Sequence, residues 1–251
     1  MSIDTGQLAR WAWERGWAGP QGIMFDEGRA LHHLATEVWG PGVFPCFRLL
    51  VPPRRRVGNL YAYSTMDAKA LRAAAQAQAL PEHLEVLRLA RLQSKAMPTH
   101  WHERQRLGFD LRARPVRRLR CALNGPTEKI SAGSEVDAFL VEALRHHPDA
   151  PDGMSSKGRT RQEVYLDWLA ERLAPAAELD RTASRLASFR RLRVARETRE
   201  SEGPDVVVHG ILAVAEPAAF SALLKRGVGR HRAYGFGMLL LRPPGRPALI
   251  Q

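Results

Sequence analysis

The chain has 251 residues, with 38 Lys and Arg against 26 Asp and Glu, so its formal net charge at pH 7 is +12. No apolar run reaches the roughly 18 residues of a membrane-spanning helix, and the two cysteines are too far apart in sequence for a zinc-binding spacing or a disulfide framework. These features argue against a membrane-spanning protein and a disulfide-rich secreted scaffold. A domain this basic usually binds a polyanion, most often nucleic acid. Because the first residues lack a signal-peptide pattern, we expect a cytoplasmic protein. The cysteine spacing offers no metal site, and we expect neither a metal nor a cofactor.

The first part of the chain predicts a mixture of helices and strands. Residues 8–13 mix apolar and charged side chains and fit a first strand. Asp26 stands at the N-cap of a helix that runs to about Val38, because apolar residues recur after it at the helical period. Residues 44–51 and 57–63 predict two strands joined by a turn that contains three arginines.

Two further helices are expected over residues 67–80 and 81–95. The break at residues 98–102 ends this part of the chain. We therefore place a domain boundary there, which gives an N-terminal domain of residues 1–103 and a C-terminal domain of residues 104–251.

The second domain begins with a strong strand signal. Residues 106–115 alternate apolar side chains with Gly108, Asp110, Arg112 and Arg114. This period-two pattern predicts a strand with one apolar and one basic edge.

Helix and strand signals alternate in the rest of this domain. Thr160 and Glu163 form a capping box, which predicts the start of a helix. Residues 206–214 are β-branched and apolar on both faces, as expected of a central strand. A helix over 217–226 and a strand over 238–242 complete the pattern.

An arginine-rich segment covers about residues 180–200. Its apolar residues Leu186, Phe189 and Leu192 are three positions apart, which predicts a helix with a thin apolar stripe and arginines on all sides. Such a helix has little to hold it against a core, so we expect it to project as a finger. A solvated helix with internal Glu–Arg pairs is one interpretation, and contact with a polyanion is the other; the shortage of acidic residues favours the polyanion.

A glycine-rich loop covers residues 227–237, where two Gly-hydrophobic-Gly units flank a basic stretch. Glycines allow positive φ and a close approach of backbone amides to a ligand. Arg230, His231 and Arg232 lie between them, so a phosphate backbone is the expected ligand. The glycines alone would also suit a tight connection with no ligand.

The order of the elements predicts an α+β fold of two tandem ferredoxin-like domains, the fold that RNA-recognition motifs also use. The arginine-rich segment would be a helical insertion in the second domain.

Four pieces of the chain, in order, resemble the CRISPR repeat-processing endoribonucleases of the CasE type. They are residues 109–115, residues 156–158 ahead of the helix at 165–169, residues 209–212, and the glycine-rich loop with the strand after it. The resemblance covers the second half well and the first half in outline. The arginine-rich segment is similar to the finger of the processing nuclease of type IV CRISPR systems.

The resemblance implies that the chain binds the hairpin of a CRISPR repeat RNA and cuts precursor crRNA once, near the base of the stem, without a metal. The ribose 2′-OH attacks the neighbouring phosphate and leaves a 2′,3′-cyclic phosphate and a 5′-OH. Such a reaction needs groups that transfer protons and cations around the phosphorane. The protein is expected to stay on the mature crRNA and to join other subunits of a CRISPR effector complex.

The family carries a catalytic histidine early in its first helix, and this position falls on Gly28. His32 and His33 lie one turn later; they take over proton transfer, or cleavage depends on Arg29 and other arginines. Two exposed surface histidines are the alternative. The resemblance gives Lys157 and Arg242 roles at the scissile phosphate.

The basic and glycine residues of these segments form the predicted RNA-binding set. Its members are Arg159, Arg161, Arg181, Arg185, Arg190, Arg191, Arg193, Arg196, Gly227, Gly229, Arg230, His231, Arg232, Gly235 and Gly237. A second hypothesis is a non-cleaving subunit that holds the crRNA hairpin, which the glycine at position 28 keeps open. A binder of double-stranded DNA has no recognition-helix pattern to support it.

Overall fold

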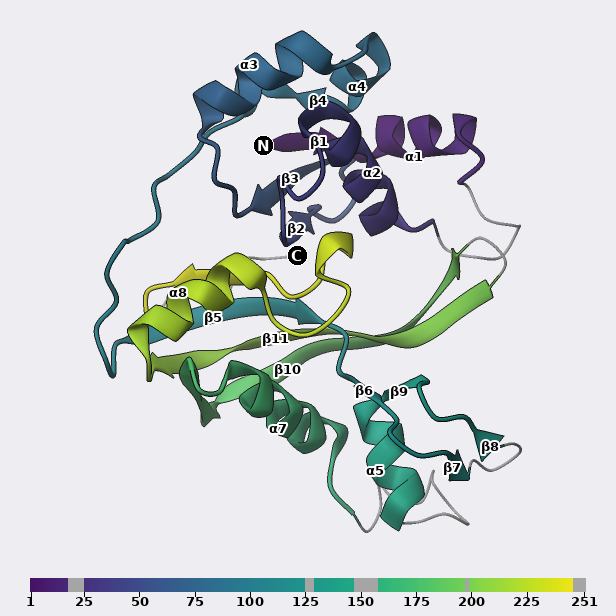
Figure 1. Cartoon of the computed structure of the whole chain (residues 1–251), viewed down its shortest axis with the longest axis vertical. Coiled ribbons are helices and arrows are strands. Elements are labelled where there is room, and N and C mark those ends of the chain that lie inside the picture. Colours follow the sequence, from purple (N-terminus) through teal and green to yellow (C-terminus); the bar gives the residue numbers. More distant parts are fainter. Residues whose placement is uncertain (18–24, 125–128, 147–157, 197–198, 246–251) are drawn as a thin grey trace.

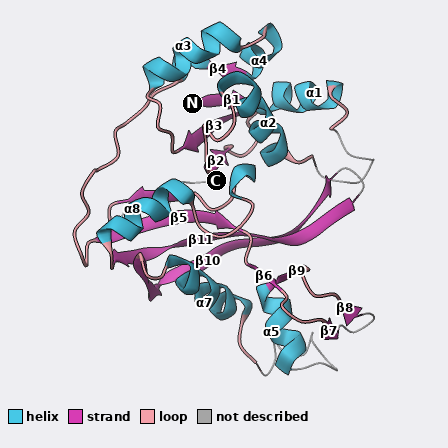
Figure 2. Cartoon of the chain, viewed as in Figure 1, coloured by secondary structure: helices cyan, strands magenta, loops and turns pink. Residues whose placement is uncertain are grey.

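The computed structural model describes residues 1–17, 25–124, 129–146, 158–196 and 199–245, and the side chains of residues 194–201 also fall outside this description. Two sheet-containing halves lie one above the other, and two long strands of the second half reach out to one side (Figures 1 and 2). Within the described ranges, no helix is long and apolar enough to cross a membrane.

The first half is a four-stranded antiparallel sheet covered by helices. Its strands are β1 (Ser2–Asp4), β2 (Phe47–Leu50), β3 (Val57–Ala62) and β4 (Leu87–Arg88), in the order β2-β3-β1-β4. Its helices are α1 (Thr5–Glu14), α2 (Glu27–Trp39), α3 (Ala68–Gln78) and α4 (Pro81–Val86), and the short turn η1 (Leu89–Arg91) follows. The side chains of Asp4, Asp26 and Asp67 accept backbone N–H groups at the starts of α1, α2 and α3, which fixes where these helices begin.

The second half contains the longer sheet. Its strands are β5 (Arg106–Ala113), β10 (Ala177–Arg196), β11 (Arg199–Val214) and β12 (Leu239–Arg242), in the order β10-β11-β5-β12. Helices α7 (Arg161–Leu173) and α8 (Pro217–Arg226) cover it, and the turn η3 (Arg232–Tyr234) precedes β12. A small group between β5 and α7 contains β6 (Val116–Arg118), β7 (Leu123–Asn124), β8 (Lys129–Ile130), β9 (Glu135–Asp137) and α5 (Ala138–His146).

Both halves have the same topology. In each, a strand, a helical segment, two strands, a second helical segment and a last strand follow one another, and the sheet order is second, third, first, fourth. This is the ferredoxin-like arrangement, so the predicted fold of two such units is confirmed. The boundary near residue 103 stays a prediction; the two sheets draw on residues on either side of it.

Each half has a core of its own. The predicted stripe of α2 is buried in the first core through Leu31, Leu34 and Val38. In the second core, Phe109 and Leu111 of β5 pack with α7 and α8. The alternation of β5 thus buries its apolar edge, as the sequence predicts.

The polar face of β5, which carries Asp110 and Arg112, is turned toward the first half of the molecule. Asp110 is 1% exposed and its Oδ1 lies 3.9 Å from Nη2 of Arg48, on β2 of the first half. Arg112, two residues further along β5, is also largely buried. The face of β5 that carries these charges therefore lies in the interface between the halves.

The arginine-rich segment is a strand, so the prediction of a helical finger is wrong. Its residues lie in β10, which forms a long antiparallel hairpin with β11. A bulge at Ala187 explains part of the error: Leu186 pairs with Val208, and Phe189 pairs with Val206, whereas Leu192 follows in regular pairing on the other face. The extra residue places two side chains that are three positions apart on one face of the strand, which imitates a helical spacing. The segment nonetheless projects, as expected.

Two other predictions in the first half need correction. Residues 8–13 lie in helix α1, where Leu8, Trp11 and Ala12 are buried at a helical spacing. Residues 81–95 do not form one helix, because α4 ends at Val86 and the next two residues join the sheet as β4.

Candidate functional site

The glycine-rich loop connects α8 to β12 and lies against both halves. Gly227 and Gly235 have φ of 77° and 82°, in the left-handed region that favours glycine. A Cβ on Gly227 would lie 3.0 Å from Cβ of Cys46, and one on Gly235 would lie 3.2 Å from the ring of Phe47. Both neighbours belong to the first half, so these glycines let the loop dock there.

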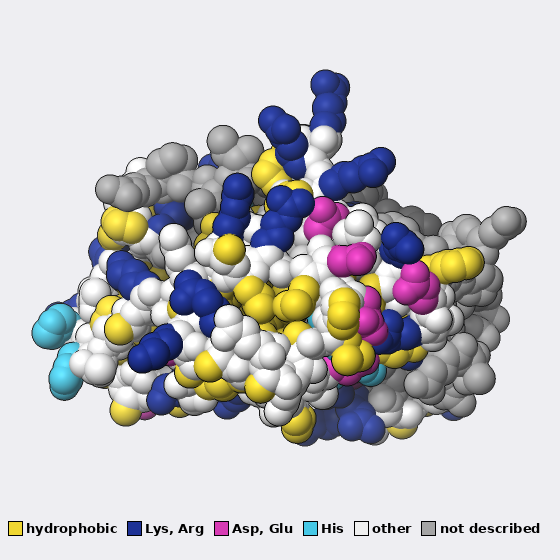
Figure 3. Space-filling model, turned by 90° about the horizontal axis from the view of Figure 1, so that it is seen from above, with side chains coloured by type: hydrophobic (Ala, Val, Ile, Leu, Met, Phe, Trp, Pro, Cys, Tyr) yellow, Lys and Arg dark blue, Asp and Glu magenta, His cyan; other side chains and the backbone are white. Residues whose placement is uncertain are grey.

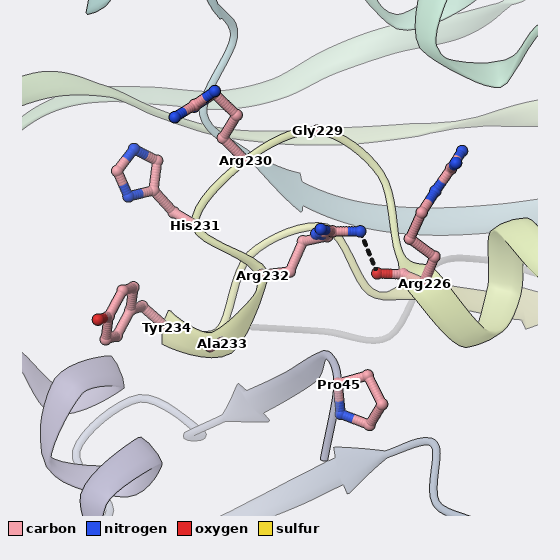
Figure 4. A pocket seen from close by; sticks show the side chains of 8 residues that line it. All are labelled: Pro45, Arg226, Gly229, Arg230, His231, Arg232, Ala233 and Tyr234. Carbon is pink, nitrogen blue, oxygen red and sulfur yellow. Dashed lines mark hydrogen bonds between the residues drawn. The ribbon is translucent and has the colours of Figure 1, made fainter. Parts of the chain in front are cut away.

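The basic residues of the loop line an open pocket of about 630 Å³ (Figure 4). Its lining is Pro45, Arg226, Gly229, Arg230, His231, Arg232, Ala233 and Tyr234. Nε of Arg230 and Nε2 of His231 lie 2.5 Å and 2.8 Å from the two carboxylate oxygens of Glu135. Burial alone would raise the pKa of Glu135, but the His231 hydrogen bond and the Arg230 charge outweigh it and hold this pKa below its usual value.

The first turn of α2 is in contact with the loop. A Cβ on Gly28 would lie 2.2 Å from the carbonyl oxygen of Tyr234, so a side chain at position 28 has no room while the loop holds this place. One turn later, the ring of His32 lies 5.3 Å from that of Tyr234, and the ring of His33 lies 4.4 Å from that of Trp17.

Both imidazoles are kept neutral by their surroundings. Burial lowers the pKa of His32, and the neighbouring His33 lowers it further. Burial and the charge of Arg29 lower the pKa of His33. The lowered pKa values favour the neutral imidazoles, which suit accepting a proton better than giving one to a leaving group.

A second concavity, the interface cleft, opens between the halves and has a volume of about 370 Å³. It is lined by Glu27, Arg48, Leu49, Leu50, Val51, Arg112, Ser188, Phe189, Arg190, Asp205 and Val207. Helix α2 and strand β2 supply one wall, and β5, β10 and β11 supply the other. Charged side chains from five distant segments therefore meet in one place.

Asp205 holds two arginines of the interface cleft in place. Its carboxylate accepts two hydrogen bonds from Arg112, at 2.8 Å and 2.7 Å, and one from Arg190 at 2.7 Å. Burial favours the neutral acid, but these two guanidinium groups outweigh it and lower the pKa of Asp205. Behind the cleft, Nε2 of His209 lies 2.9 Å from Oδ2 of Asp110.

The family profile described as "CRISPR associated protein" matches residues 25–243. The chain belongs to this CRISPR-associated family. Among curated protein sequences no relative matches it.

Solved structures share the fold of this family member over almost its whole length. Thermus thermophilus Cse3 bound to an RNA representing a pre-cleavage complex is 17% identical, with a TM-score of 0.56, over 96% of this chain and 97% of that one. The CRISPR endoribonuclease Cse3 bound to a 19-nucleotide RNA gives a TM-score of 0.58 at 17% identity, over 96% and 97% of the two chains. Cas6e from Escherichia coli K-12 gives 0.52 at 15% identity, over 86% and 92%.

The catalytic residues expected from the family resemblance do not form one cluster in this chain. Arg29, His32 and His33 lie together on α2, next to the loop. Arg242 pairs with Gly108 at the start of β5, which is roughly 13 Å along the strand from Arg112. Lys157 lies outside the described residues.

Outside the glycine-rich loop, the predicted RNA-binding arginines divide into two groups. Those around α7 are held in ion pairs: Arg159 and Arg181 with Asp167, and Arg161 with Asp137. Those on β10 are more exposed, with Arg191 and Arg193 near Glu202 and Arg190 on Asp205. Arg185 is also exposed, and the side chain of Arg196 is outside the description. The RNA-binding roles of both groups stay predictions.

The sequence did not single out Glu27, Arg48 or Asp205. The alternation along β5 indicated part of the cleft, because it placed Asp110 and Arg112 on the face away from the core. No local pattern marked Arg48, since it lies in a strand whose four residues are all buried. The clustering of these charges depends on how the halves dock.

Proposed function

We propose that this family member binds the hairpin of a CRISPR repeat RNA and cleaves precursor crRNA by attack of the 2′-OH, without a metal. The observation that carries the proposal is the juxtaposition, between two ferredoxin-like halves, of a pocket with four basic side chains and a cleft that adds three arginines. Guanidinium groups bind phosphate oxygens and stabilise the charge that develops on a phosphorane.

The distribution of charge supports an RNA ligand. Lys and Arg side chains gather and project along one border of the molecule when it is viewed from the side of the first half (Figure 3). Exposed arginines also follow one another along β10 in the projecting hairpin. The solved Cse3 structures of the same fold contain RNA. Retention of the mature crRNA and association with other effector subunits belong to the same proposal.

A non-cleaving subunit that holds the crRNA hairpin is the second candidate. One observation favours it: the position of the family's histidine is Gly28, and the carbonyl oxygen of Tyr234 fills the space beside it. A chain that had lost the catalytic group would keep the basic surfaces and bind without cutting.

The deciding experiment incubates the purified protein with its host's repeat RNA in EDTA, beside the same RNA with one 2′-deoxyribose at the cut site. We expect one discrete cut in the first RNA, with a 2′,3′-cyclic phosphate end, and none in the second. Activity that EDTA abolishes and magnesium restores would point to metal-dependent hydrolysis. Tight binding with neither RNA cut would establish the non-cleaving subunit.

A further inference from the structure

The carboxylate of Glu27 lines the interface cleft and, in the described structure, is not paired with an arginine there. Glu27 is the first residue of α2 and is placed by the Asp26 cap, whose side chain accepts the Arg29 amide at 2.9 Å. Two carboxylates line the cleft, and that of Asp205 already accepts hydrogen bonds from two arginines. Among the described residues, the Glu27 side chain forms no hydrogen bond and no ion pair. It is therefore available to a ligand.

Arg48 lies on β2, in the same wall of the interface cleft as Glu27, and approaches Asp110 no closer than 3.9 Å. Its side chain is 4% exposed, and its Nε and Nη2 groups have no hydrogen-bond partner among the described atoms. Burial and the neighbouring Arg112 lower the pKa of Arg48 to about 10, so the guanidinium is still charged at pH 7. Buried donors of this kind are costly unless a partner satisfies them. A phosphate oxygen in the cleft would do so.

Arg190, from the second half, is another arginine of the interface cleft that can contact a phosphate. It reaches Asp205 through a 2.7 Å contact while its side chain is 57% exposed. The exposed part of the group can therefore also meet a ligand that enters the cleft.

We propose that Glu27 accepts the proton of the attacking 2′-OH, while Arg48 and Arg190 hold the scissile phosphate in the interface cleft. This assignment rests on the cleavage proposed above and names the group that replaces the histidine absent at position 28.

The step balances without a co-reactant. Glu27 takes the 2′-OH proton as the 2′-oxygen forms its bond to phosphorus, and the bond from phosphorus to the 5′-oxygen breaks. The leaving 5′-oxygen takes up a proton from water, and Glu27 later returns its own to water. The products are a 2′,3′-cyclic phosphate and a 5′-OH.

The surroundings of Glu27 suit this task. Burial raises its pKa, and Arg112 and Arg190 only partly oppose this, so the carboxylate is a stronger base than an exposed one. The charged groups that face it are Asp26 on its own helix, Arg48 on β2, Arg112 on β5, Arg190 on β10 and Asp205 on β11.

The test is single-turnover cleavage of the host's repeat RNA by wild type, Glu27→Gln, Glu27→Asp and the control Glu14→Gln, each at a series of pH values. Glu14 is an exposed acid of the same half and pairs only with Arg10 in the described structure. We expect Glu27→Gln to bind the hairpin within about threefold of wild type and to lose roughly 10²–10⁴-fold in rate. The wild-type rate should rise with pH and level off, whereas the residual Glu27→Gln rate should lack that inflection. Glu27→Asp should retain the inflection at a reduced rate.

The outcomes separate the two proposals. A wild type that cuts, together with Glu27→Gln cutting at the same rate, overturns the role of Glu27 and leaves the cleavage proposal intact. A wild type that binds but never cuts overturns both. If Glu27→Gln loses binding as much as cutting, while Glu14→Gln and Glu27→Asp bind normally, the carboxylate holds RNA and is not the proton acceptor.

Discussion

The interface cleft and the projecting hairpin are both rich in arginine, but they use it differently. In the cleft, Arg112 is held by two hydrogen bonds to a buried carboxylate, which fixes the position of its guanidinium group. On the hairpin, Arg191 and Arg193 lie near Glu202 at 3.2 Å and 3.5 Å, and their side chains are mostly exposed. Fixed cations suit a reaction centre, whereas exposed ones suit a long, salt-sensitive contact with a phosphate backbone.

Beyond the cleft, the projecting hairpin is a ribbon of two strands that carries many arginines. Beyond Asp205, β11 pairs only with β10, so the outer edges of this ribbon have no neighbouring strand among the described elements. Charged side chains on such edges discourage pairing with other chains. Under the proposed function, the same arginines would both contact RNA and protect the edges, and the experiments below separate the two regions.

The largest effect is expected from Asp205→Ala. Removing this carboxylate leaves Arg112 and Arg190 without their shared partner in a mostly buried site, which typically costs about 3–5 kcal/mol of stability. Denaturant unfolding measures the loss. The matched control is Glu202→Ala, which removes the exposed partner of the hairpin arginines and should cost under about 1 kcal/mol. Equal losses would contradict the distinction between the two regions.

The next effect concerns RNA affinity. The triple alanine variant of Arg185, Arg191 and Arg193 spares Arg190, because that residue belongs to the cleft. If the three contact phosphates, the slope of log K against log salt should fall by about 2–3 and affinity should drop at least about tenfold at moderate salt. Binding titrations at several salt concentrations give both quantities. Alanine at Arg10, Lys69 and Arg91, exposed on the first half, is the control with the same change in charge.

A smaller effect is expected where the loop touches α2. Gly28→Ala would place a Cβ 2.2 Å from the Tyr234 carbonyl oxygen, and overpacking of this kind costs about 1–3 kcal/mol. Gly6→Ala is the control, because its Cβ would meet its nearest neighbour at an ordinary 3.4 Å near the start of α1. Thermal unfolding compares the two variants. No difference between them would mean that the loop gives way easily.

The smallest effect is the pH dependence due to His32 and His33. Their folded pKa values are lowered, so protonation favours the unfolded chain and their contribution to stability is lost as pH falls below the ordinary value of about 6.5. The double glutamine variant should lose less stability than wild type between pH 7 and pH 5. Glu27 acts in the opposite sense: its raised pKa costs stability as pH rises through it. Parallel stability curves would show that the imidazoles are solvated.

Much of the fold could be predicted because its signals are local. The cap at Asp26, the capping box at Thr160 and the alternation of β5 each depend on a few neighbouring residues, and each predicted its element correctly. The prediction for the arginine-rich strand failed partly for a local reason, since the bulge at Ala187 puts Leu186 and Phe189, three positions apart, on one face of the strand. Propensity could not reveal that bulge, because it exists only in the pairing with β11.

The interface cleft could not be predicted in this way. Glu27, Arg48 and Asp205 come from segments far apart in the chain, and each looks ordinary among its neighbours. Their meeting depends on the docking of two halves, which no period in the sequence encodes. The glycine-rich loop shows the complementary case: its composition marked it out, but Cys46 and Phe47, which crowd Gly227 and Gly235, belong to the other half.

The projecting hairpin also bears on how such proteins can diverge. From Arg190 to Arg196, β10 pairs only with residues 199–205 of β11, so this part can lengthen or shorten without disturbing either core. Because side chains alternate with a period of two, a change of two residues in each strand keeps every remaining side chain on its face and shifts the tip by about 7 Å. Under the proposed function, the reach of the protein along an RNA stem could thus change in steps, while the interface cleft at the base of the hairpin stays the same.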